Sequence, residues 1–283
     1  MTDLPPLSDE LRAEIEGLAN DLDAFRTRRP RATPTGQLED RRHALLARHT
    51  SRPPTEKLTC IGDSNTMFFA GAEHLRFIRY RRSGLWKPNW INRGLDLLPC
   101  FRVFHVGPAT AWKAGDHGSS TRSREKLEIL LKKDVAKGSK VLISFGEIDC
   151  RIHMARAIQA GKDLHEAVAA TATKFVELPA WIASQGFEPV IWGPPQIIPK
   201  DEKLSSPTFP FVGPWELRRD ITYAFIDALD RECSTRGFPM IAIAGLYHPR
   251  EAKADLSFFH DGVHLSQRLM PLALSALHEA GVF

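Results

Sequence analysis

The stretch LTCIGDSNTMFFAG, residues 58–71, joins a short apolar run to a glycine, a carboxylate and a hydroxyl. Its opening run predicts a buried strand, and the mostly apolar residues after Ser64 predict a helix. Two interpretations of Gly62-Asp63-Ser64 fit this junction. In one it is a strand-to-helix turn, with Gly62 giving backbone freedom and Asp63 or Ser64 capping the helix. In the other, Ser64 is a nucleophile presented at the end of the strand.

Downstream of this stretch, apolar runs alternate with segments of helical periodicity. Consecutive strand and helix patterns predict a parallel sheet joined by right-handed crossovers and covered by helices on both faces. The strands are almost continuously apolar, as strands buried on both faces are. The sequence therefore predicts an α/β fold. Its strands after the first are expected at 101–106, 140–145, 189–192 and 239–244, and its helices at 123–137, 163–185, 215–236 and 266–280.

The first 56 residues have a different pattern. Residues 8–27 and 38–49 each show apolar side chains near helical spacing, and the basic, proline-containing segment RTRRPRATPTG, residues 26–36, separates them. We interpret residues 1–56 as a helical N-terminal extension and residues 57–283 as the α/β domain.

Composition narrows the class of protein. The chain has 283 residues, of which 43% are hydrophobic and 25% charged, an ordinary globular composition. No run of eighteen apolar residues predicts a membrane span, and the polar N-terminus is unlike a secretory signal. The four cysteines are expected to be buried, reduced thiols, which suits a cytoplasmic protein. A net charge of +4 permits an anionic ligand without requiring one.

Polar residues follow the predicted strands at the points where each strand ends. Because the carboxyl ends of parallel strands meet at one edge of a sheet, these residues are expected to gather there. A histidine base can activate a serine, and an aspartate can orient that histidine. Glycine lets a substrate carbonyl approach the backbone amides that would face an oxyanion. The residues concerned are Ser64, Gly107, Glu147, Asp149, Arg151, Asp261 and His264.

Four short motifs, in order, resemble the sequence blocks of the SGNH (GDSL-type) hydrolase superfamily. They are IGDSN, the glycine after the second strand, FGEID and DGVHLS, and the resemblance runs from about residue 57 to the C-terminus. It implies a flavodoxin-like three-layer α/β/α fold with a five-stranded parallel sheet in the order 2-1-3-4-5. It also implies Ser64 as nucleophile, His264 as base and Asp261 as the partner of that base. The backbone amides of Ser64 and Gly107, at the strand ends, are the expected donors to the oxyanion.

One block departs from the family pattern. The third block is normally Gly-x-Asn-Asp, and alignment on Gly146 and Asp149 places Ile148 where the asparagine donates to the oxyanion. Losing one such donor typically lowers the rate by about 10²–10³, or about 2.7–4 kcal/mol. Arg151 and Asn65 are the nearby candidates to replace it, and the fixed cationic fork of arginine also suits a carboxylate or phosphate.

Several of these residues also have purely structural interpretations. Glu147, Asp149 and Arg151 are equally consistent with a salt-bridged turn that caps the next helix. Cys150 and His153 form a Cys-x-x-His pair without a second pair, a weak metal signal. We therefore predict no metal and no cofactor.

Two loops are candidate binding elements. RYRRSGLWKPNWINR, residues 79–93, mixes arginines with two tryptophans and suits an acidic glycan, a nucleic acid or a partly packed surface loop. No nucleic-acid module surrounds it, so we expect no nucleic-acid partner. The long proline-rich segment 194–214 follows the fourth strand and is expected to help shape the substrate pocket.

Together these observations predict a serine ester hydrolase that removes a small acyl group from a carbohydrate or small metabolite. Two alternatives stay open. The chain could transfer the acyl group to a sugar hydroxyl instead of water, or it could be a catalytically silent member that binds a glycan or partner through the same pocket. Ile148 favours the silent alternative, while Ser64, Asp261 and His264 oppose it.

Overall fold

The structure is a computed structural model that describes residues 57–283 apart from 73–74, 76, 83–89, 96, 99, 199–208, 248 and 254. The predicted N-terminal extension, residues 1–56, lies outside the described residues, as do residues 199–208 of the loop 194–214. No described helix combines the length and the apolar character needed to cross a membrane.

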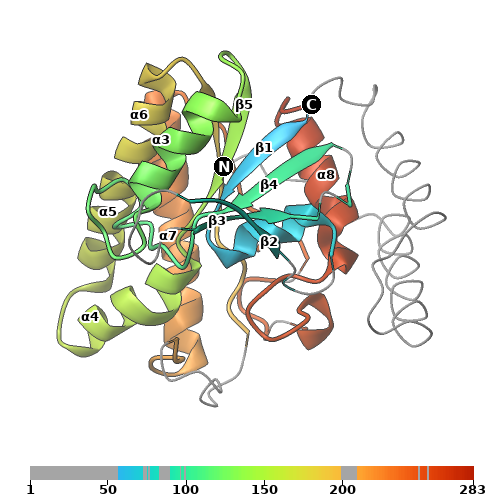
Figure 1. Cartoon of the computed structure of the whole chain (residues 1–283). Coiled ribbons are helices and arrows are strands. Elements are labelled where there is room, and N and C mark those ends of the chain that lie inside the picture. Colours follow the sequence, from blue (N-terminus) through green and yellow to red (C-terminus); the bar gives the residue numbers. More distant parts are fainter. Residues whose placement is uncertain are drawn as a thin grey trace.

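A single twisted sheet organises the described chain (Figure 1). The five strands expected from the sequence run parallel and in the expected order, here β4-β1-β5-β6-β7. The prediction of a five-stranded sheet is wrong, because the sheet has seven strands in the order β2-β3-β4-β1-β5-β6-β7. Their bounds are β1 Leu58–Gly62, β2 Phe77–Arg82, β3 Trp90–Gly94, β4 Phe101–His105, β5 Lys140–Ser144, β6 Glu188–Trp192 and β7 Met240–Ile241.

The two additional strands extend the β4 edge. β2 pairs with β3, and β3 pairs with β4, both in antiparallel register. They include the described ends of the segment that the sequence suggested was a loop. The arginine-rich sequence of β2 has no apolar alternation, so periodicity alone does not reveal it as a strand.

Helices follow the parallel strands as predicted, but one expected helix is divided into two. The expected helix over 163–185 is two helices that meet at Val176. Pro179 explains the break, because it has no N–H to donate to the carbonyl of Phe175, where the first helix ends. The bounds are α3 Ser123–Lys133, α4 Ala155–Gln159, α5 Leu164–Phe175, α6 Glu177–Ser184, α7 Trp215–Arg236 and α8 Met270–Glu279, with a 3-10 helix η1 at Ser64–Ala70 and a π-helical turn η2 at Asp149–Met154.

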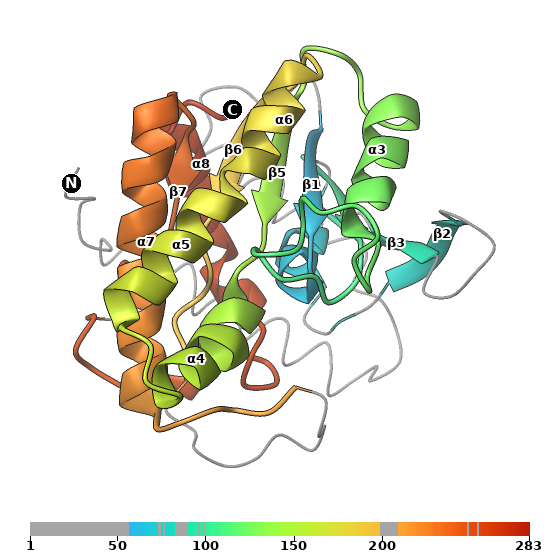
Figure 2. The ribbon, with the colours of Figure 1, turned by 90° about the vertical axis from the view of Figure 1, so that its left-hand side faces the viewer.

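Apolar side chains alternate between the two faces of the sheet. Cys60 and Val103 point to the side covered by η1 and α8, whereas Ile61 and Phe104 point to the side covered by α3, α5, α6 and α7. Figures 1 and 2 show α8 on one side of the sheet and the other four helices on the opposite side. Helices on both faces are compatible with the three-layer α/β/α architecture that the sequence predicts.

All four cysteines are buried and unbridged, as expected. They are Cys60, Cys100, Cys150 and Cys233. Their burial makes them packing residues on both sides of the sheet.

Candidate active site

The turn after β1 presents Ser64 at the carboxyl edge of the sheet. Asp63 caps η1 by accepting a hydrogen bond from the Asn65 N–H at 2.8 Å. Only glycine fits at position 62, because a Cβ there would lie 2.0 Å from Thr66 Oγ1 and 2.1 Å from the Ser144 carbonyl oxygen. The chain must therefore turn tightly, and Ser64 becomes the first residue of the helix. The cap and the presented hydroxyl, which the sequence left as alternatives, are both present.

Ser64, His264 and Asp261 form a continuous hydrogen-bonded chain. Ser64 Oγ lies 2.7 Å from His264 Nε2, and His264 Nδ1 lies 2.7 Å from Asp261 Oδ2. The other Asp261 oxygen accepts the N–H groups of Val263 and His264 at 3.0 and 2.9 Å. Two residues separated by 200 positions thus meet at one edge of the sheet, within the 2.6–3.2 Å range that proton transfer requires.

The surroundings keep Asp261 ionised. Partial burial raises the pKa of its carboxyl, but the hydrogen bonds from His264 and the nearby charges of His264 and His260 lower it further, to well below the usual range. An ionised carboxylate on Nδ1 holds the imidazole with Nε2 facing the serine and stabilises an imidazolium.

The peptide between Val106 and Gly107 is held from behind by a buried lysine. Lys126 Nζ donates to the Val106 carbonyl at 2.6 Å. Carbonyl and N–H point in opposite directions across a trans peptide, so this bond directs the Gly107 N–H away from Lys126. Gly107 has φ +110°, a conformation that favours glycine. No hydrogen bond among the described residues uses the Gly107 N–H or the Ser64 N–H.

Burial lowers the pKa of the Lys126 ammonium to about 8, and the charge of Glu125 opposes that shift. Sequence patterns do not reveal a role for Lys126, because a lysine on an amphipathic helix is ordinarily exposed to solvent. The only available hint was its position three residues into a helix that follows the Gly107 loop.

Ile148 and Asn65 are both buried beside the turn. Ile148 occupies the position of the family asparagine and has no polar side-chain atom to donate. In the described part of the chain, neither the Oδ1 nor the Nδ2 atom of Asn65 has a hydrogen-bond partner. A buried side-chain amide without hydrogen-bond partners is rare in folded proteins.

The Arg151 guanidinium is held by hydrogen bonds to other parts of the protein. Its Nε and Nη2 atoms donate to the two Glu147 oxygens at 2.5 and 3.0 Å, and Nη1 donates to the carbonyls of Phe209 and Pro210 at 2.7 and 3.2 Å. The guanidinium is buried. These bonds attach the described end of the loop 194–214 to η2 and engage three of the guanidinium nitrogens, which leaves little capacity for an oxyanion.

Asp149 lies under the loop that follows β4. Its buried carboxylate accepts the backbone N–H groups of Ala111 and Trp112 at 2.6 and 3.3 Å. Burial raises its pKa to about 7, although these backbone hydrogen bonds oppose the shift. These hydrogen bonds fix the loop that follows β4 and contains Gly107 against η2. Asp149 therefore helps to hold that loop in position.

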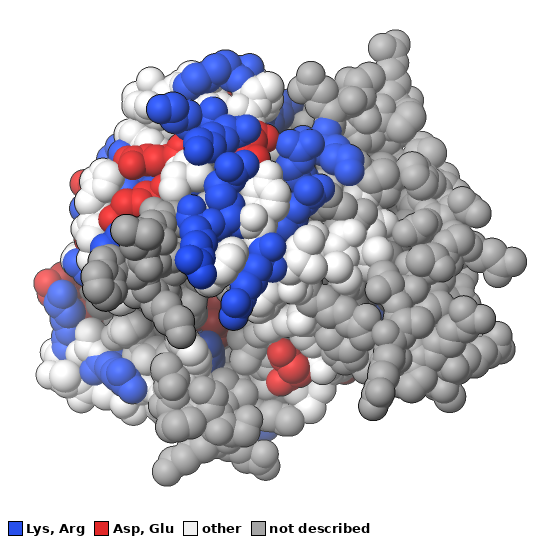
Figure 3. Space-filling model, viewed as in Figure 1, with Lys and Arg blue, Asp and Glu red and all other residues white. Residues whose placement is uncertain are grey.

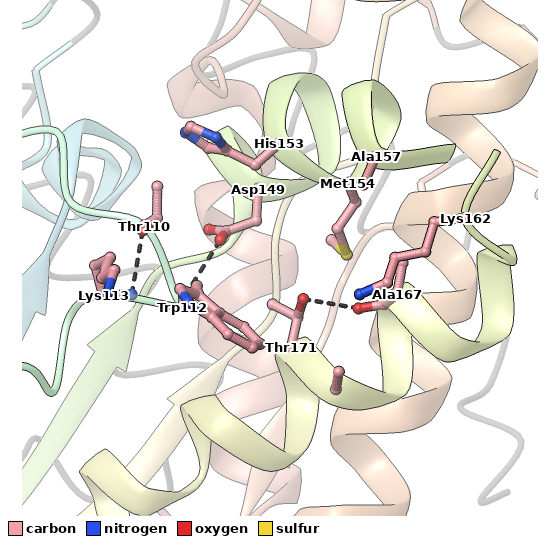
Figure 4. Close-up of a pocket in the computed structure, with 11 residues that line it drawn as sticks. Thr110, Trp112, Lys113, Asp149, His153, Met154, Ala157, Lys162, Ala167 and Thr171 are labelled. Carbon is pink, nitrogen blue, oxygen red and sulfur yellow. Dashed lines mark hydrogen bonds between the residues drawn. The ribbon is translucent and has the colours of Figure 1, made fainter. Parts of the chain in front are cut away.

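A cavity of about 340 Å³ opens beside this loop (Figure 4). Trp112 and Lys113 come from the loop, Asp149 and His153 from η2, and Lys162 from the segment before α5. The Lys113 ammonium pairs with Asp116 at 3.0 Å. Aromatic, cationic and imidazole side chains around one cavity suit a polar ligand with planar or ring surfaces.

Among the described residues, His260, Asp261 and His264 are a group whose ligand atoms lie within 4.8 Å of one another. The His260 ring stacks on the His264 ring, with 5.6 Å between centroids and 15° between planes. Asp261 and His264 already bind each other and Ser64, so a metal here would compete with that chain.

Cys150 is fully buried, and burial raises the pKa of its thiol well above the usual value.

Comparison with known proteins adds structural neighbours of low similarity. No family model matches the chain, and no curated protein matches it. A carbohydrate acetylesterase from Sinorhizobium meliloti is 15% identical with a TM-score of 0.45, and the match covers 81% of this chain and 100% of that one. The OSK domain of Drosophila Oskar is 13% identical with a TM-score of 0.46, and the match covers 84% and 94%. An aryl esterase from M. smegmatis is 14% identical with a TM-score of 0.41, and the match covers 80% and 99%. We base the function on the residues of the site itself.

Proposed function

We propose that the protein is a serine ester hydrolase that acts through a covalent acyl-enzyme. The observation that carries this proposal is the hydrogen-bonded chain from Ser64 through His264 to Asp261, with 2.7 Å at each side-chain contact. A serine hydroxyl is a weak nucleophile until a base removes its proton, and this chain supplies the base and its orienting carboxylate.

In the first half-reaction Ser64 Oγ attacks the ester carbonyl while His264 Nε2 accepts the hydroxyl proton. The tetrahedral intermediate collapses, the bond to the alcohol breaks, and His264 returns the proton to the leaving oxygen. In the second half-reaction water attacks the acyl-serine, again with His264 as base, and releases the acid. Asp261 stays ionised throughout and stabilises the transient imidazolium.

The N–H groups of Ser64 and Gly107 are the proposed backbone donors to the oxyanion. Both lack an acceptor among the described residues. The unpartnered amide of Asn65 is the proposed third donor, in place of the asparagine that Ile148 replaces. Lys126 acts as a positioning residue, because its bond to the Val106 carbonyl orients and polarises the peptide that carries the Gly107 N–H.

Arg151 is better explained as a positioning residue than as an oxyanion donor. Its bonds to Glu147 and to the carbonyls of Phe209 and Pro210 hold the end of the loop 194–214 on η2. This differs from the role that the sequence suggested first, and it matches the structural alternative considered beside it.

The proposed substrate class is an acyl group on a carbohydrate or small metabolite. None of Ser64, His264 and Asp261 lines the cavity beside the loop after β4, so this cavity could receive only a part of the substrate beyond the reacting ester. Trp112 offers a ring for stacking, and His153 and Lys162 offer polar contacts at its rim. The proposed chemistry uses no cofactor.

The test uses a fluorophosphonate probe together with a small ester such as p-nitrophenyl acetate. The probe reacts only with an activated serine, so the wild-type protein should be labelled and Ser64→Ala should not. Ester hydrolysis should disappear in Ser64→Ala and in His264→Ala, while circular dichroism remains unchanged. An unlabelled wild-type protein that is properly folded would refute the proposal.

Ile148 favours a second candidate, a catalytically silent protein that binds a glycan through the same pocket. An oxyanion site without its usual asparagine is short of one donor unless Asn65 replaces it. Unlabelled wild-type protein that still binds glycans would establish this second candidate. Release of the acyl group to an added sugar rather than to water would identify the acyltransferase alternative.

A further inference from the structure

The hairpin of β2 and β3 places one of its faces on the side of the sheet that carries the site. His105 shares its face of β4 with Phe101 and Val103, which pack under η1 and α8. A Cβ at Gly94 of β3 would lie 2.6 Å from the Cβ of Ala70 in η1, so the hairpin abuts the helix that begins with Ser64.

Cross-strand register identifies the residues on this face. Asn92 pairs with His105 of β4 and with Arg79 of β2, which makes one row across three strands. Further along, Arg82 is opposite Trp90. Adjacent strands lie about 4.8 Å apart, so Arg79 is about 10 Å from His105 along the row.

The inner end of the row lies beside the end of β1, where His105 pairs with Gly62, two residues before Ser64. Asn92 Nδ2 lies 3.2 Å from His105 Nδ1, and the Phe77 ring lies 5.3 Å from the His105 ring. Burial, with the charges of Lys126 and then His264, lowers the pKa of His105 to about 4. The row therefore leads from the edge strand β2 to the end of β1, which is followed by Ser64.

The outer end of the row is cationic and aromatic. The guanidinium carbons of Arg79 and Arg82 lie 5.1 and 4.8 Å from the centroid of the Trp90 ring. Neither guanidinium has a carboxylate partner in the described part of the chain. Figure 3 shows Lys and Arg side chains forming a broad band across the face of the molecule seen in Figure 1.

An exposed apolar side chain accompanies these arginines. Phe77 is 43% exposed on the same face, whereas Ile78 belongs to the row of Arg93 and Phe104 on the opposite face. Arginines on an edge strand also discourage strand pairing between molecules. That explanation accounts for the charges but not for an exposed phenylalanine directly beside His105.

We propose that this face of the hairpin, formed by Phe77, Arg79, Arg82, Trp90 and Asn92, binds an acidic polysaccharide and guides its ester groups to Ser64. The proposal rests on the proposed ester hydrolase function and names its substrate class. Arginine forks suit the carboxylates of uronic acids, and sugar rings stack on aromatic faces beside them.

The chemistry of the neighbouring site favours a polysaccharide over a nucleic acid. Among the described residues, the proposed face has two arginines without carboxylate partners, Arg79 and Arg82. The row also ends at an arrangement suited to carboxylic esters, which nucleic acids do not carry. The positive field around the hairpin would concentrate an anionic polymer near the site.

The binding test does not depend on catalysis. Affinity electrophoresis in gels with polygalacturonate measures the dissociation constant of Ser64→Ala, with and without the added pair Arg79→Gln and Arg82→Gln. The pair should weaken binding about tenfold, and added salt should weaken it further. The control pair Arg231→Gln and Arg236→Gln removes the same charge from exposed positions of α7 and should leave binding intact.

A kinetic test then links the surface to the reaction. The ratio of kcat/KM on acetylated polygalacturonate to kcat/KM on neutral acetylated xylan should fall about tenfold in the hairpin pair, mainly through KM. Equal binding in both pairs, or no binding of polygalacturonate by any protein, would overturn the proposal. Tighter binding of single-stranded RNA than of polygalacturonate would also overturn it. If the wild type shows no Ser64-dependent hydrolysis, the proposed function fails. The electrophoresis still tests whether the hairpin face binds an acidic polysaccharide.

Discussion

Asp63 carries a testable consequence for stability, because a carboxyl group is buried next to the proposed nucleophile. It is almost completely buried, and its Oδ2 atom has no hydrogen-bond partner among the described residues. Burial, reinforced by the nearby charges of Glu147 and Asp149, raises its pKa from 3.8 to about 8, despite the opposing hydrogen bonds from Asn65. At neutral pH this carboxyl is therefore protonated in the folded protein and ionised in the unfolded chain.

The sign of the effect follows from this difference. From about pH 4 to pH 8 the folded protein binds one proton that the unfolded chain has released, so its stability falls as the pH rises. Each pH unit lowers the free energy of unfolding by about 1.4 kcal/mol, and the full window of 3.8 to about 8 amounts to about 6 kcal/mol at most. Below pH 4 both states are protonated and the loss is absent.

Asp63→Asn removes the titrating group and keeps the side-chain oxygen that caps η1. The free energy of unfolding of the variant, relative to wild type, should rise by about 4 kcal/mol between pH 5 and pH 8. Urea unfolding followed by circular dichroism at each pH unit measures this difference.

The control is Asp230→Asn, which replaces an exposed aspartate on α7 and should show no such change with pH. The pKa of the Asp149 carboxyl is also raised, to about 7. Asp149 titrates in both proteins, so only its electrostatic coupling with Asp63 remains in the comparison. A stability difference between Asp63→Asn and wild type that stays constant from pH 5 to pH 8 would refute the burial argument.

Three further predictions concern the site and its support. Asp261→Asn should lower kcat by about 10⁴ in a p-nitrophenyl acetate assay, because the imidazole loses the carboxylate that orients it; an active variant contradicts the triad. Lys126→Met should lower kcat on the same ester about tenfold or more, with a smaller change in KM. Lys126→Arg should recover part of the lost kcat. A change in KM alone would refute the role of Lys126 in orienting the Gly107 peptide. Gly146→Ala should lower the melting temperature by several degrees more than Gly118→Ala does. Both glycines have positive φ, but only at Gly146 would an added Cβ meet a ring carbon, Phe225 Cε1, at 2.6 Å. Equal shifts in melting temperature would exclude that contact.

Much of the central sheet could be predicted from local patterns. Continuous apolar runs identified the five parallel strands, and the long helix over 215–236 was expected with the same bounds that α7 has. Because parallel strands place their carboxyl ends along one edge, Ser64, Asp261 and His264 could be assigned to one place from their positions after strands. The chain order of motifs was sufficient for this, and the structure joins the three residues by hydrogen bonds.

Periodicity does not detect elements that are held by partners distant in sequence. β2 carries exposed arginines, and β3 carries the half-buried Arg93. β3 becomes a strand because the β4 edge offers unpaired backbone groups, and β2 pairs in turn with β3. The break between α5 and α6 is a local effect of Pro179, and attention to that residue would have predicted it.

Charged groups in the interior depend on tertiary contacts most of all. The sequence shows that Lys126, Arg151 and Asp63 are ionisable, but whether each faces water or the interior depends on which helix or loop packs over it. Burial and the few partners available there give Lys126 its bond to Val106, engage Arg151 with Glu147, and keep Asp63 protonated near neutral pH. The free energy of a buried charge depends on the atoms within a few ångströms of it, and folding brings those atoms from distant parts of the chain.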